Sequence, residues 1–132
     1  MQWSEELSVK ISAFDEEHKR LIAIFNNLSD AMSQGKSQNV LSDILTELSN
    51  YTKTHFRREE EAMQKYNYPA FPEHKQAHDE FIRRLSEAQA QHAGGNVRLG
   101  IPIFNFLTLW VQNHIKQMDR SYSEFFNNAG LK

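Results

Sequence analysis

The sequence predicts an all-α protein, an antiparallel up-down-up-down four-helix bundle with an N-terminal arm. Apolar residues recur at three- and four-residue steps through most of the chain, which is the period of an amphipathic helix. Glycines and prolines interrupt this pattern at a few points and leave short connections, which make consecutive helices antiparallel neighbours. Because the chain has 132 residues, we expect one domain over 1–132.

The breaks in the apolar pattern define the expected elements. Residues 1–14 alternate only weakly around Val9, so they are expected to form an arm across the bundle. The four helices are expected over about 15–34, 38–66, 72–92 and 102–128. Gly35 suits the left-handed position after the first helix, and Pro69 follows the second. Pro72 and Pro102 fit the first turns of the third and fourth helices.

The composition excludes several classes of protein. A net charge of -2 gives no basic surface for nucleic acid and no polybasic patch for an anionic membrane. The chain has no cysteine, which excludes thiolate zinc sites, iron–sulfur clusters and disulfides and suits a reducing compartment. Neither a signal peptide nor an apolar run of the roughly 18 residues of a membrane helix is apparent. We therefore expect a soluble cytoplasmic protein, monomeric or weakly homo-oligomeric.

Five histidines and two carboxylates are candidate metal ligands because they continue the apolar stripes of the helices. They are His18, His55, Glu59, His74, His78, His114 and Asp119. Residues four apart lie on one face of a helix, so the clustered pairs aim their side chains in one direction. Left unpaired in the core, each such polar group would cost roughly 1–3 kcal/mol. Metal ligation would remove this cost for the whole set.

The donor types narrow the choice of metal. Five imidazoles are too nitrogen-rich a set for calcium or magnesium, and seven ligands are too many for one zinc ion. Two six-coordinate ions fit better. If both carboxylates bridge and an oxo or hydroxo group bridges as well, the ligands fill about 11 of 12 octahedral positions and leave one for an exogenous ligand. The set also differs from the Glu-x-x-His pairs of ferritin-like di-iron proteins.

The five-residue step between His114 and Asp119 does not fit a regular helix, because it corresponds to about 140° around the axis. Two arrangements would solve this. Either the two side chains reach the metal from different sides, or the helix opens into a π-type turn.

With these residues the chain resembles the bacterial hemerythrins over nearly its whole length. The matching segments are Trp3, Asp15–Lys19, His55–Glu60, His74–His78 and Trp110–Asp119. The resemblance implies a centre of two iron ions with a bridging oxo or hydroxo group. It also implies that His74, His78 and His114 hold the six-coordinate iron, that His18 and His55 hold the iron with the open position, and that Glu59 and Asp119 bridge them.

The resemblance implies reversible O2 binding at the open position. We expect the pocket around bound O2 to be lined by the nearest stripe residues, Leu21, Phe56, Trp110 and Val111, which are also core residues. His92 lies near a helix end and is expected not to be a ligand. Glu60 and Glu61 are expected to form a solvated face beside Glu59.

Several functions would use such a site. The leading one is transport or storage of O2, or its local delivery to an O2-consuming cytoplasmic enzyme. The alternatives are sensing of O2, redox state or NO, and an enzyme that reduces peroxide or NO. Against an enzyme, the sequence shows no inward general acid or base besides the ligands. Iron storage lacks the ferritin-like ligand set, and a metal-free bundle would leave five buried histidines unexplained.

Overall fold

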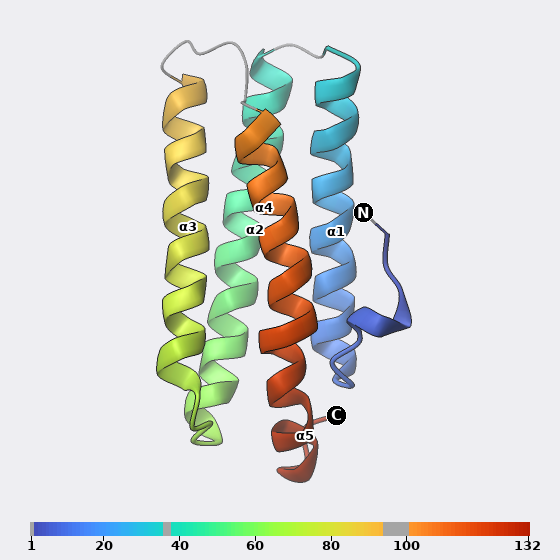
Figure 1. Ribbon diagram of the computed structural model, residues 1–132, viewed down its shortest axis with the longest axis vertical. Coiled ribbons are helices and arrows are strands. Elements are labelled where there is room, and N and C mark those ends of the chain that lie inside the picture. The colour runs from blue at the N-terminus through green and yellow to red at the C-terminus, as the bar shows by residue number, and fades with distance from the viewer. Residues whose placement is uncertain (1, 36–37, 94–100) are drawn as a thin grey trace.

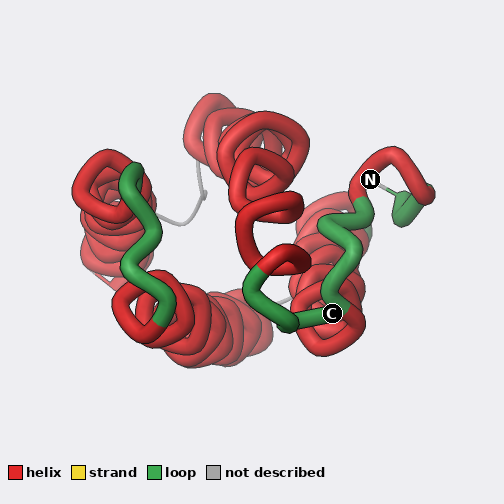
Figure 2. Tube along the Cα trace, turned by 90° about the horizontal axis from the view of Figure 1, so that it is seen from below, coloured by secondary structure: helices red, strands yellow, loops and turns green. Residues whose placement is uncertain are grey.

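The described residues form four helical rods. These rods enclose a common core (Figures 1 and 2). The computed structural model describes residues 2–35, 38–93 and 101–132, and the side chains of 2–35, 40–90 and 105–132. The elements are η1 (Glu5–Leu7), α1 (Ser12–Ser33), α2 (Gln38–Lys65), α3 (Phe71–Ala93), α4 (Ile101–Asn113), η2 (His114–Asp119) and α5 (Arg120–Asn128). The described residues contain no strand. The predicted all-α four-helix bundle is confirmed.

The helices alternate in direction, and α2 packs against both α1 and α3. The segments α4, η2 and α5 follow one another without a loop and form the fourth rod of the bundle (Figure 1). Among the described residues, no helix combines the length and the apolar character that crossing a membrane requires.

The N-terminal arm joins the first and last helices. Its backbone turns at Lys10, where φ is 59°, and α1 begins two residues later, three residues earlier than the sequence indicated. The carboxylate of Asp15 accepts hydrogen bonds from the Ser8 hydroxyl at 2.6 Å and from the Val9 N–H at 2.8 Å. The Ser123 hydroxyl of α5 donates to the Val9 carbonyl at 2.6 Å. The arm is therefore hydrogen-bonded to the first helix, α1, and to the last, α5.

Buried apolar residues form two clusters with a polar layer between them. One cluster runs along the bundle and includes Leu21, Phe56, Phe81 and Val111. The other lies toward the arm and α5 and consists of Val9, Ile11, Phe14, Met63, Tyr122 and Phe126. On α1, α2 and the fourth rod, the predicted ligands lie in sequence between members of the two clusters. The polar layer of the bundle thus lies between two buried apolar clusters.

Candidate metal centre

All seven predicted ligands lie in this polar layer and are buried. His18 comes from α1, His55 and Glu59 from α2, His74 and His78 from α3, and His114 and Asp119 from η2. None of them has more than 6% of its surface exposed, and carboxylates are almost never buried to this degree unless they are paired. The packing of four separate helices therefore brings all seven residues into one layer.

The seven residues form two groups of potential ligand atoms that share both carboxylates. One group is Glu59, His74, His78, His114 and Asp119, and the other is His18, His55, Glu59 and Asp119. Within each group the ligand atoms all lie within 4.8 Å of one another. Two ion positions with two common carboxylates are the arrangement expected of a carboxylate-bridged dinuclear centre.

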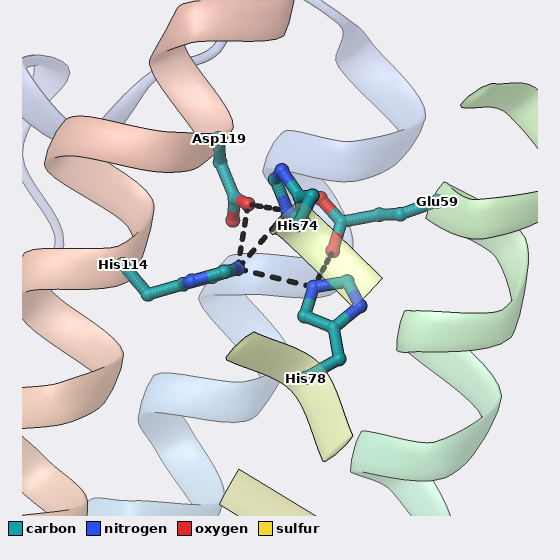
Figure 3. Close-up of side chains that lie close together, drawn as sticks. All are labelled: Glu59, His74, His78, His114 and Asp119. Atoms are coloured by element: carbon teal, nitrogen blue, oxygen red, sulfur yellow. Dashed lines mark hydrogen bonds and ion pairs between the residues drawn. The ribbon is translucent and has the colours of Figure 1, made fainter. Parts of the chain in front are cut away.

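The group with three histidines is tightly gathered (Figure 3). The Nε2 atom of His114 lies 3.0 Å from Nε2 of His78 and 3.1 Å from Nε2 of His74. Oδ1 of Asp119 lies 2.9 Å from Nε2 of His74 and 3.0 Å from Nε2 of His114. Atoms at right angles around an ion about 2.1 Å away are about 3.0 Å apart, so these spacings match neighbouring ligands of one six-coordinate ion.

The group with two histidines contacts the same two carboxylates from the other side of the layer. Nε2 of His18 lies 3.2 Å from Oδ2 of Asp119 and 3.8 Å from Oε2 of Glu59. Nε2 of His55 lies 3.1 Å from Oε1 of Glu59. The two oxygens of Asp119 therefore face histidines of different groups, which suits a bridging carboxylate.

A π-helical segment in the fourth rod explains how His114 and Asp119 can face the same side although they are five residues apart. Residues His114–Asp119 form η2, and the N–H of Arg120 donates to the carbonyl of Ile115, five residues earlier. This wider turn places His114 and Asp119 on the same side, so the second of the two predicted arrangements is the one observed. It also shifts the buried face by one residue. A regular helix would place Met118 inward, but Met118 is half-buried and Asp119 is buried instead.

The hydrogen bonds of the outer ring nitrogens test whether a metal fits. Nδ1 of His78 donates to Oε2 of Glu60 at 2.9 Å, and Nδ1 of His55 donates to Oε1 of Glu17 at 2.6 Å. In a neutral imidazole the proton on Nδ1 leaves Nε2 as a bare acceptor. These acceptor atoms then lie beside carboxylate oxygens and other ring nitrogens, which are acceptors as well. A cation bound between them would remove the repulsion among these atoms. The donor set fits metal ions.

Glu17 and Glu60 are parts of the site that the sequence did not reveal. Glu17 also accepts from Nη1 of Arg58 at 2.5 Å, and Glu60 lies 3.5 Å from Nζ of Lys75. Each forms a carboxylate–histidine pair, an arrangement that fixes the ring orientation and raises the basicity of a metal-binding imidazole. Glu60 was expected to lie on a solvated face and not to be a ligand. It belongs to neither group of candidate ligand atoms, but its side chain is half-buried against His78, so the solvated-face part of that expectation is wrong. Glu61 is exposed, and the His92 side chain lies outside the described residues.

Tyr122 was also left without a role by the sequence. Its side chain is fully buried, and its hydroxyl donates a short hydrogen bond to Oε2 of Glu59. Its ring stacks on His74 with a centroid separation of 5.7 Å. Tyr122 therefore restrains one carboxylate and one histidine of the site at once.

The charges of the layer favour a cation. Burial on its own lowers the pKa of His55, but the charge of Glu59 and the hydrogen bond to Glu17 raise it to about 10. Burial and the neighbouring Asp119 raise the pKa of Glu59, yet contacts with His55 and His78 bring it below its ordinary value. The carboxylates thus stay ionised and hold a positive charge between them, the role that metal ions would take.

A small cavity of about 10 Å³ adjoins the group with two histidines. Leu21, Phe56, Trp110 and Val111 all line it, together with Ile115 and the candidate ligands His18, His55, His114 and Asp119. This volume is near the minimum that holds a single water molecule. Neither His74 nor His78 lines it.

The chain matches the family model described as hemerythrin HHE cation binding domain over residues 9–125. The bacteriohemerythrin of Pseudomonas aeruginosa (strain LESB58) is 35% identical over 120 residues, which cover 91% of this chain and 77% of that protein. The hemerythrin-like protein of Naegleria gruberi is 30% identical over 120 residues, which cover 91% of this chain and 88% of that protein.

Solved structures agree with the sequence comparison. A crystal structure of wild-type hemerythrin superimposes with a TM-score of 0.88 at 28% identity and covers 94% of this chain and 95% of its own. Since the family model covers residues 9–125 and the bundle holds a buried histidine–carboxylate layer, the chain belongs to the hemerythrin family.

Proposed function

We propose that the protein binds O2 reversibly at a di-iron centre held by His18, His55, Glu59, His74, His78, His114 and Asp119, and serves in transport, storage or local delivery of O2 in the cytoplasm. Membership of the hemerythrin family supports an O2-binding di-iron protein rather than an enzyme. Two bound irons with an oxo or hydroxo bridge would supply the site for O2 and the electrons that it accepts and returns.

The observation that carries the proposal is the asymmetry of the two ligand groups. Three histidines and two carboxylates surround one ion position, whereas two histidines and the same carboxylates surround the other. The small cavity is lined by both histidines of the smaller group and by only one of the larger. The open coordination position and the small cavity would therefore lie on the same side.

The lining of the cavity favours binding over further chemistry. Leu21, Phe56, Val111 and Ile115 are at most 5% exposed and exclude water from the ligand. Apart from the proposed metal ligands, no described residue that lines the cavity can give or take a proton. The side chains around bound O2 would therefore supply no proton for its irreversible reduction. The same open position would also suit NO, so NO binding or sensing is a second use of the site.

Iron content and reversibility test the proposal. The purified protein should contain about two irons per chain. Air admitted to the anaerobically reduced protein should generate a visible charge-transfer band that disappears when O2 is removed. His74→Ala should lose iron, whereas His92→Ala, at the histidine that the sequence places outside the ligand set, should not. A single iron, bound zinc, or a band that never reverses would contradict the proposal.

A further inference from the structure

Two tyrosines connect the candidate metal centre to the surface at the α2–α3 end of the bundle. The hydroxyl of Tyr122 contacts Glu59, and its ring stacks on His74. The ring of Tyr68 meets that of Tyr122 edge-on at a centroid separation of 6.5 Å. Tyr122 is fully buried and Tyr68 is half-buried, so the pair spans the distance from the metal layer to solvent.

The outer member of this pair opens onto a surface groove. The groove has a volume of about 380 Å³ and is lined by Met63, Gln64, Asn67, Tyr68, Phe71 and Pro72. This volume falls in the range of small-molecule sites, roughly 300–1,000 Å³. Its walls are apolar and aromatic apart from two side-chain amides and the phenol itself, which suits a small aromatic molecule.

We propose that Tyr122 and Tyr68 form an electron relay that discharges oxidising equivalents from the metal centre to small phenolic reductants bound in this groove. The inference rests on the di-iron centre of the proposed function but concerns a separate reaction, the response of the fully oxidised protein to hydrogen peroxide. Reversible O2 binding does not need the relay.

Hydrogen peroxide accepts two electrons through the relay and two protons from solvent, its O–O bond breaks, and two waters form. For each electron that Tyr122 gives to the centre, its phenolic proton moves along the existing hydrogen bond to Glu59. Tyr68 then gives an electron to the Tyr122 radical and a proton to solvent, and Tyr122 recovers its own proton from Glu59. A phenol in the groove restores Tyr68 by giving up one hydrogen atom, so two phenols are oxidised per peroxide.

The surroundings of the relay keep both tyrosines ready as neutral donors. Burial, together with the charges of Asp119 and Glu73, raises the pKa of Tyr68. Phe125 packs on the Tyr68 ring at 5.2 Å, and Phe126 on the Tyr122 ring at 4.9 Å. Neither phenylalanine can compete for the oxidising equivalent, because an unsubstituted ring is far harder to oxidise than a phenol.

Trp110 is the one alternative donor stacked on a candidate ligand in the described part of the chain. Its ring lies 4.3 Å from that of His114, on the α4 side of the site. It makes no hydrogen bond that would carry its proton to a ligand, whereas Tyr122 does. Oxidation through Trp110 would leave the radical on the opposite side from the groove, so the two routes can be told apart.

Electron paramagnetic resonance of the iron-loaded protein tests the relay. The oxidised protein mixed with hydrogen peroxide should show a tyrosyl radical, identified by a hyperfine pattern that collapses when the tyrosines are ring-deuterated. In Tyr68→Phe the radical should persist on Tyr122, and its decay on adding a small phenol should slow about tenfold. In Tyr122→Phe no radical should reach Tyr68. Tyr66→Phe is the matched control and should behave as the wild type.

Each outcome separates the relay from the proposed function, because iron content and reversible O2 binding are measured on the same samples. Loaded, O2-binding protein that forms a tryptophan radical, or no radical, would overturn the relay and leave O2 binding standing. A Tyr68→Phe radical that phenol quenches at the wild-type rate would overturn the groove as the reduction site. Protein that fails to load two irons would refute the proposed function instead.

Discussion

Nδ1 of His78 on α3 donates a hydrogen bond to Oε2 of Glu60 on α2 over 2.9 Å. The Glu60 side chain is 19% exposed, whereas that of His78 is fully buried. A carboxylate at the surface thus orients an imidazole inside the bundle. Its counterpart is Glu17, which holds His55 in the same way, so each of the two ligand groups has one histidine fixed by an outer carboxylate.

Glu60→Gln should weaken metal binding without removing a ligand. The amide keeps the size of the side chain but loses the charge that raises the basicity of the His78 ring, and such changes cost roughly 10–100-fold in metal affinity. Iron retained against a competing chelator measures the effect. Glu61→Gln, at the exposed neighbouring position, is the matched control. Equal retention of iron by the two variants would show that the Glu60 hydrogen bond has no influence on the metal.

Val111→Ala should speed the irreversible oxidation of the reduced, O2-bound protein several-fold. Val111 is 1% exposed and lines the small cavity, so its truncation leaves space for water beside the open position. The loss of the charge-transfer band in air measures the rate. Val9→Ala removes the same atoms from an equally buried position in the other apolar cluster. If both variants oxidise at the same rate, or Val111→Ala oxidises more slowly, the cavity does not control water access.

The iron-free protein should lose stability at alkaline pH, and the iron-loaded protein should not. In the iron-free protein the pKa of His55 is raised from 6.5 to about 10, chiefly by Glu59 and Glu17 acting against burial. Its protonation therefore stabilises the fold fully below about pH 6.5, and this contribution disappears as the pH rises through about 10. Bound iron would occupy Nε2 and remove the dependence.

Urea unfolding of chelator-treated and loaded samples between neutral pH and about pH 10.5 measures this difference. His78, whose pKa is also raised by Glu59 and Glu60 against burial, adds to the same trend. Parallel pH dependence in the two samples would mean that the imidazoles are not the groups that titrate.

Deleting Gln117 should remove the π-helical turn but keep Tyr122 and Phe126 facing the core, because the residue is exposed and ligates nothing. Without it, His114 and Asp119 are four residues apart and share a face of a regular helix, so the register of α5 is kept. The deletion protein should therefore still bind two irons, with a thermal midpoint close to that of the wild type. Gln117→Ala keeps the length of the segment and should match the wild type in both measurements. A deletion protein that loses its iron and unfolds at a clearly lower temperature would contradict this prediction.

The sequence contained enough to predict the bundle and the gathering of the histidines, because both follow from the helical period. Residues such as His74 and His78 share a face whatever the rest of the fold does. The roles of Glu60 and Glu17 could not be read in this way. Each contacts a histidine on another helix, and that contact depends on how two helices are rotated against each other.

The inward position of Tyr122 was not predicted, for a related reason. A regular helix continued from Val111 and His114 places Met118, Ser121 and Phe125 on the inner face, whereas the structure buries Asp119, Tyr122 and Phe126. The sequence left two explanations for the step from His114 to Asp119, and only the π-helical one brings Tyr122 inward. The start of α1 was placed three residues too late because the turn at Lys10 has no marker such as glycine.

The π-helical segment has a consequence at the level of the coding sequence. Because η2 contains one residue more than a regular helix of the same rise needs, a relative that lacks this codon can form a regular helix there and still bury the same face of α5. Such a relative would align with this chain on either side of a one-residue gap. Its histidine and aspartate would be four residues apart instead of five, so alignments of such proteins should be anchored on the histidine and the aspartate separately.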